Sequence, residues 1–104
     1  MGILIVDDSA DDRLLLQSIL SAAGYDHLLV ADSAAAAFRL LGLDDGKHGA
    51  ASRVDLILMD MGMPILNGWQ ATHRIKTSQQ TCAIPIIALT AYARKARSRK
   101  RARA

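Results

Sequence analysis

The sequence predicts an α/β fold, a doubly wound parallel sheet covered by helices on both faces. Short, continuous apolar runs recur along the chain, as in strands that are buried on both faces of a parallel sheet. Segments with helix-capping residues lie between these runs, and strands that alternate with helices indicate parallel pairing with right-handed crossovers. The 104 residues are enough for one such domain with one core.

Four strands are expected from the apolar runs. Each run is short, aliphatic or β-branched, and bounded by polar residues, glycine or proline. The four expected strands are Gly2–Val6, His27–Ala31, Val54–Met59 and Pro85–Leu89.

The first expected helix follows the first strand and runs to about Ala23. Asp8 or Ser9 can cap its N-terminus, and Gly24 is placed to end it as a C′ residue. Its apolar residues share one face of the helix, which we expect to pack on the sheet. These residues are Leu15, Leu16, Ile19, Leu20 and Ala23.

Two further helices are expected, and the end of the chain is compatible with another. Asp32 and Ser33 offer a cap for a helix over Ala34–Leu41, and the third helix runs from about Gly68 to Lys76. A polar loop separates the second helix from the third strand. Trp69 is expected to pack against the loop that precedes the third helix.

Charge divides the chain into two parts. All ten acidic residues are Asp and precede Met61, whereas seven Lys and Arg residues lie between Arg94 and Ala104. Residues 1–93 carry six bases and ten acids, a net charge of −4, so we expect a domain over 1–93 and a basic tail over 94–104. Because no aromatic residues interleave the tail bases, the tail is expected to make no specific contact with nucleic acid.

Several classes of protein are disfavoured. No stretch approaches the roughly 20 apolar residues that cross a bilayer, and no secretory signal opens the chain. A single cysteine, Cys82, excludes an internal disulfide. We therefore expect a cytoplasmic protein that does not bind membranes.

Three carboxylates follow or end two of the expected strands. Asp7 and Asp8 follow the first strand, and Asp60 follows the third. Ligands of such sheets bind at the carboxyl edge of the strands, where these side chains would meet. Crowded carboxylates repel one another unless a cation lies among them, and Mg²⁺ takes a few carboxylates and several waters. A carboxylate beside Mg²⁺ can accept a phosphoryl group.

Other roles remain open for these residues. Asp residues often end strands as turn formers or helix caps, which would explain each one separately. Thr90 ends the fourth strand at the same edge. Its hydroxyl suits either a hydrogen bond to a phosphoryl oxygen or the N-cap of a following helix.

These motifs resemble the receiver domain of two-component response regulators. The resemblance covers Met1 to about Arg94. It depends on Asp7-Asp8, on the segment from Asp60 to Gly68 and on the segment from Ile84 to Ala91. It implies a flavodoxin-like sheet in which this chain supplies the strand order 2-1-3-4.

The resemblance also implies roles for individual residues. Asp60 would be the phosphoacceptor, and Thr90 the hydroxyl that switches toward the phosphoryl group. Mg²⁺ would be bound by Asp7, Asp8, Asp60 and the backbone carbonyl of Gly62, with Asp7 acting mostly through water. The phosphodonor would be a sensor histidine kinase or a histidine phosphotransfer protein, and the output would be partner binding.

The resemblance implies a fifth strand and helix that this sequence does not match, so residues 1–93 are expected to form an incomplete receiver. The lysine that the family places on that strand has no counterpart here. The fourth strand would then be an exposed edge, and Ile84, Ile86, Ile87 and Leu89 would lose cover. Marginal stability, or a homodimer through this edge, is expected.

Two alternatives to a phosphoacceptor receiver are considered. One is a degenerate receiver that acts only as an interaction module. The other is a phosphohydrolase that uses an aspartyl phosphate, but such enzymes commonly place a second Asp two residues after the nucleophile, where this chain has Gly62. We therefore expect Mg²⁺-dependent phosphorylation of the chain itself and no independent enzymatic turnover.

Overall fold

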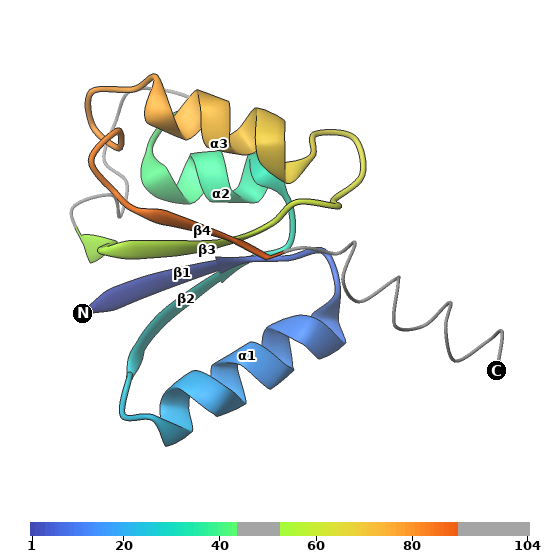
Figure 1. Cartoon of the computed structure of the whole chain (residues 1–104), viewed down its shortest axis with the longest axis vertical. Helices are drawn as coiled ribbons and strands as arrows, with labels where there is room; N and C mark the ends of the chain where they lie inside the picture. The colour runs from blue at the N-terminus through green and yellow to red at the C-terminus, as the bar shows by residue number, and fades with distance from the viewer. Residues whose placement is uncertain (44–52, 90–104) are drawn as a thin grey trace, which may run out of the picture.

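The computed structural model describes residues 1–43 and 53–89 and contains a four-stranded, fully parallel sheet (Figure 1). The strands lie in the order β2-β1-β3-β4, which confirms the predicted order. Their bounds are β1 Gly2–Val6, β2 His27–Ala31, β3 Leu56–Asp60 and β4 Ile86–Leu89.

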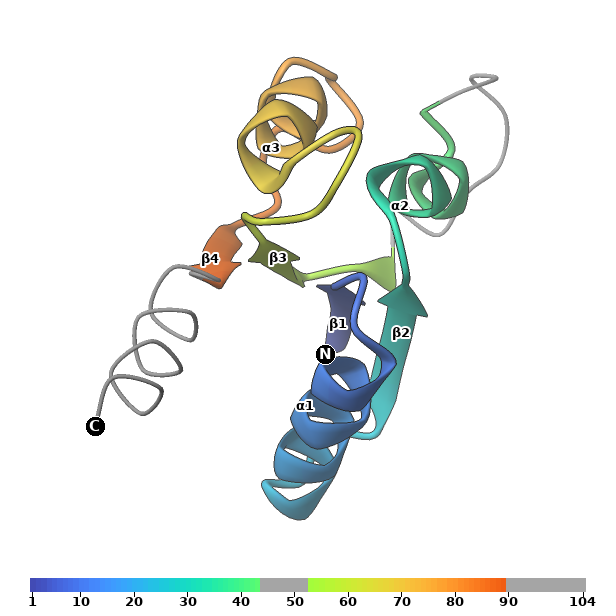
Figure 2. The same cartoon turned by 90° about the vertical axis from the view of Figure 1, so that its right-hand side faces the viewer.

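Helices cover both faces of the sheet, as predicted. The described helices are α1 Ala10–Ala22, α2 Ala34–Leu41 and α3 Gly68–Lys76. α2 and α3 lie side by side on one face, and α1 lies on the other (Figures 1 and 2). None of the helices in the described ranges is long and apolar enough to span a membrane.

Local capping explains where the helices begin and end. Of the two candidate caps for α1, Ser9 is the N-cap, because its hydroxyl accepts the Asp12 N–H. The helix ends in a Schellman motif, in which Gly24 has a φ of 99° and the Tyr25 N–H donates to the Leu20 carbonyl. The predicted role of Gly24 is therefore confirmed.

Two strand boundaries differ from the prediction. β3 begins at Leu56 rather than Val54, and it extends to Asp60, which pairs with Leu89. The acceptor candidate is thus the last residue of the strand and not the first residue of the loop. β4 begins at Ile86 because Pro85 has no N–H to donate, although its carbonyl accepts the Ile57 N–H.

The larger core lies between the sheet and helices α2 and α3. Leu4 and Val6 of β1 face this side, and Ile3 and Ile5 face α1, as alternation along a strand requires. The larger cluster includes buried side chains from β3, α2 and α3, namely Ile57, Met59, Ala34, Ala37, Phe38, Leu41, Ala71 and Ile75.

The face of the sheet under α1 is less well covered than expected. No residue of α1 is buried, and Leu15 and Ile19 are 58% and 55% exposed. Only Leu16 and Leu20, of the apolar residues on this helix, pack against the smaller core cluster. In the described ranges α1 is the one helix on this face, so the outer part of its apolar stripe meets no neighbour.

The prediction for the β4 edge is partly wrong. Ile84 is buried in the larger core, because it precedes the strand and packs on the α2 and α3 side. Ile87 is half exposed, and Ile86 and Leu89 are partly buried. The predictions for Thr90, for a helix from Ala91 and for the basic tail lie outside the described residues.

Candidate functional site

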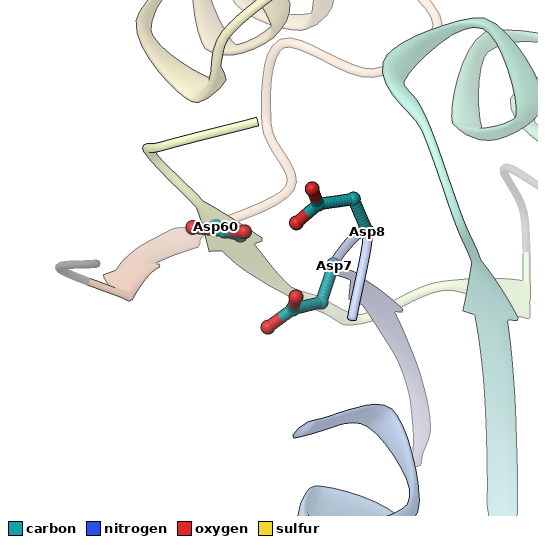
Figure 3. A group of neighbouring side chains, drawn as sticks. All are labelled: Asp7, Asp8 and Asp60. Atoms are coloured by element: carbon teal, nitrogen blue, oxygen red, sulfur yellow. The ribbon is translucent and has the colours of Figure 1, made fainter. Parts of the chain in front are cut away.

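The three predicted carboxylates meet at the carboxyl edge of the sheet. Asp7, Asp8 and Asp60 each offer one oxygen, and these oxygens lie within 4.8 Å of one another. Figure 3 shows Asp60 at the end of β3 and the carboxylates of Asp7 and Asp8 on the adjacent turn after β1. The pairing of Val6 with Met59 produces this arrangement, because it brings the next residues, Asp7 and Asp60, level with each other.

Asp7 is buried and held by its backbone and side chain. Its N–H donates to the Ala31 carbonyl of β2 at 3.1 Å, and its Oδ1 accepts the Ser9 N–H at 2.9 Å. Its carbonyl accepts from Arg13 Nη1 at 2.7 Å. The next residue, Asp8, is exposed, so one side of the cluster is open to solvent.

Asp60 is buried, with 1% of its surface exposed, and its pKa is raised from 3.8 to about 6. Burial is the largest cause, because removal from water penalises the charged carboxylate. The Gly62 N–H, which donates to Oδ1 at 3.0 Å, acts in the opposite direction. The negative charges of Asp7 and Asp8 raise the pKa further.

This arrangement fits a hard divalent cation. Three carboxylates within reach of one point supply the oxygen ligands that Mg²⁺ prefers, and the exposed position of Asp8 leaves room for bound waters. The raised pKa of Asp60 indicates that repulsion and burial disfavour its charge in the absence of an ion. A cation would offset both effects.

The loop after Asp60 is held close to β3. Asn67 caps α3 and forms a reciprocal capping box with Gln70, which the sequence analysis did not identify. Gly68 approaches the backbone so closely that a Cβ there would overlap the Asp60 carbonyl oxygen. Gly62 is exposed, and Trp69 is also largely exposed, so the expectation that Trp69 packs against this loop is wrong.

Arg13 is the site-adjacent residue that the sequence analysis missed. It lies four residues after the Ser9 cap, where the positive end of the helix dipole disfavours a cation. An arginine in that unfavourable position was the available signal. Its contact with Asp7, six residues earlier, depends on the geometry of the turn between β1 and α1, which the structure reveals.

Comparison with known proteins identifies the family. The response regulator receiver domain matches residues 3–104. The two-component response regulator ORR1 of Oryza sativa subsp. japonica is 37% identical in an alignment of 92 residues, and the match covers 85% of this chain and 38% of that protein. This chain therefore spans little more than a third of that relative.

Solved structures agree with this assignment. The N-terminal domain of a response regulator receiver protein from Methanoculleus marisnigri JR1 matches with a TM-score of 0.74 and 33% identity, over 86% of this chain and 66% of that one. The receiver domain of a sensor histidine kinase from Pseudomonas aeruginosa PAO1, with a magnesium ion coordinated in its active-site cleft, matches with a TM-score of 0.72 and 32% identity. That match covers 89% of this chain and 70% of the other.

The strand order, the acidic cluster at the sheet edge and these matches lead to one assignment. The chain belongs to the response regulator receiver domain family of two-component signalling.

Proposed function

We propose that this receiver accepts a phosphoryl group on Asp60 in the presence of Mg²⁺. The observation that carries the proposal is the buried Asp60 carboxylate, within 4.8 Å of oxygens from Asp7 and Asp8. These three carboxylates, with the Gly62 carbonyl, would hold the ion. The ion would offset negative charge on the transferred phosphoryl oxygens.

The chain itself supplies the nucleophile. An oxygen of the Asp60 carboxylate attacks the phosphorus of a phosphohistidine, and the P–N bond breaks. Its electron pair returns to the imidazole nitrogen, and the imidazole, protonated on its other nitrogen, leaves as a neutral side chain. The product is an acyl phosphate on Asp60. The Gly62 N–H, which donates to Asp60 Oδ1, helps to hold the carboxylate in one orientation.

The partners follow from this reaction. The proposed donor is a sensor histidine kinase or a histidine phosphotransfer protein, acting in the cytoplasm. Thr90 is proposed as the hydroxyl that responds to the acyl phosphate. The signal would be passed on by partner binding, without independent enzymatic turnover.

Phosphorylation by a small-molecule donor tests the proposal. Incubation of the chain with acetyl phosphate and Mg²⁺ is expected to give a retarded band on a Phos-tag gel, and EDTA is expected to remove it. Asp60→Asn should give no such band, because the nucleophilic oxygen is lost. Absence of a band from the wild-type chain, or an equal band from Asp60→Asn, would reject the proposal.

A further inference from the structure

We propose that Arg13 is a positioning residue for the Mg²⁺ site. The proposal rests on the function proposed above and extends it to a residue outside the acidic cluster. Arg13 lies on α1, and its Nη1 donates to the Asp7 carbonyl oxygen at 2.7 Å in a partly buried contact. This bond joins α1 to the turn that carries Asp7 and Asp8.

The Arg13 contact acts together with other bonds that hold Asp7. The Asp7 N–H is bound by the Ala31 carbonyl of β2, and its Oδ1 by the Ser9 N–H at the start of α1. The carbonyl between residues 7 and 8 is bound by Arg13. Because this peptide unit links the two acidic residues, its orientation determines how both carboxylates are presented. Groups that orient metal ligands in this way strongly affect metal affinity.

The position of Arg13 is unfavourable for the helix alone. Arg13 lies just after the first turn of α1, where the helix dipole favours anions, and Asp11 and Asp12 precede it there. A guanidinium bound to a carbonyl is a strong, charge-assisted donor. The contact with Asp7 therefore gives the cation at this position a role beyond helix formation.

Positioning and simple electrostatics predict opposite effects on Mg²⁺ binding. A guanidinium close to the acidic cluster repels a second cation, so removal of its charge alone should tighten Mg²⁺ binding. Loss of the hydrogen bond frees the peptide unit between Asp7 and Asp8, which should weaken binding. The sign of the change distinguishes the two roles.

Calorimetric titration of Mg²⁺ into the full chain tests the proposal. Arg13→Ala is expected to raise the Kd for Mg²⁺ about 10-fold. Arg13→Lys, which keeps both the charge and a donor, is expected to recover most of the affinity. Arg39→Ala is the matched control, since Arg39 is exposed on α2, on the opposite face of the sheet, and carries the same charge. It should change the Kd by less than about 2-fold.

A kinetic readout separates positioning from a loss of folding. The acetyl phosphate reaction of Arg13→Ala should need more Mg²⁺ to reach half its maximal rate, but should approach the wild-type rate at saturating Mg²⁺. Unchanged or tighter Mg²⁺ binding by Arg13→Ala would overturn this inference alone. So would a failure of Arg13→Lys to recover affinity. If the wild-type chain binds no Mg²⁺, the proposed function fails, and this inference fails with it.

Discussion

The Asp60 carboxylate is buried beside two other acids, and its burial makes the stability of the fold depend on pH. Its pKa is about 6 in the folded chain against an ordinary value of 3.8. Between these two values the folded state binds more protons than the unfolded state. The contribution of Asp60 to stability is therefore most favourable below pH 3.8 and is lost as pH rises through 6.

The first prediction follows from this loss of stability with rising pH. Without Mg²⁺, Asp60→Asn should raise the free energy of unfolding at pH 7.5 by on the order of 2 kcal/mol, because it removes the buried charge. The gain should shrink as the pH is lowered toward 4. Urea unfolding of both proteins across this pH range measures the difference. Equal stabilities at pH 7.5 would contradict the raised pKa, and added Mg²⁺ should reduce the gap by stabilising the wild type.

Ile65 adopts a backbone conformation that suits few residues. Its φ is 69°, and its side chain is fully exposed, so burial does not offset the strain of a β-branched residue in the left-handed region.

The second prediction is that Ile65→Asn stabilises the chain by about 1 kcal/mol, because Asn tolerates this conformation better. The midpoint of urea unfolding checks this change. Ile65→Val is the control, since it keeps the β-branch and should leave the midpoint almost unchanged. A midpoint for Ile65→Asn at or below that of Ile65→Val would show that the strain is relieved elsewhere.

At the scale of the elements, the start of α3 is packed directly on the end of β3. A Cβ at Gly68 would overlap the Asp60 carbonyl oxygen and lie 2.6 Å from Met61 Cα. These are backbone atoms, which cannot move aside without shifting β3. The absence of a side chain at Gly68 therefore places α3 close to the candidate site.

The third prediction is that Gly68→Ala lowers both stability and phosphorylation. The overlap should cost about 1–3 kcal/mol, as overpacking does elsewhere, and should displace Asp60. Unfolding experiments and the Phos-tag assay measure the two effects. Gly24→Ala is the control: its φ of 99° makes the substitution strained, but open space surrounds it far along the chain from the acids. It should lose stability and keep wild-type phosphorylation, and the same pattern in Gly68→Ala would refute the packing argument.

At the scale of the whole molecule, the two faces of the sheet are unequal. α2 and α3 cover a continuous core on one face. There Arg74 of α3 donates to the Leu43 carbonyl, and its guanidinium carbon lies 6.0 Å from the centroid of the Phe38 ring of α2. On the other face the core cluster is smaller, and Ile87 of the edge strand β4 is half exposed. An apolar edge strand invites pairing with another chain.

The fourth prediction is that the chain self-associates through β4 and that Ile87→Lys weakens this association. A lysine on an edge strand opposes pairing, because its charge would be buried in the interface. Sedimentation velocity at several protein concentrations measures the dissociation constant of the dimer. This constant should rise at least about 10-fold in Ile87→Lys, because a lost apolar contact of about 1.4 kcal/mol weakens binding tenfold. Leu14→Lys provides a control at another exposed apolar residue, on α1. A monomeric wild type, or equal effects of the two variants, would contradict an interface at β4.

Local sequence determined most of the fold and the composition of the site. The bounds of β1, β2, α2 and α3 were predicted as the structure has them, because continuous apolar runs and capping residues act within a few positions of the chain. The meeting of Asp7, Asp8 and Asp60 was also predicted, since parallel strands bring their carboxyl ends to one edge.

Tertiary structure decided what depends on residues far apart in the chain. The raised pKa of Asp60 depends on its burial and on the acids that follow the neighbouring strand β1. The exposure of Leu15 and Ile19 was likewise not predictable. An apolar helix face shows that the face can be buried, but it does not show that a neighbouring element covers it. Periodicity reports which side of an element can be buried, whereas packing between distant elements decides whether it is.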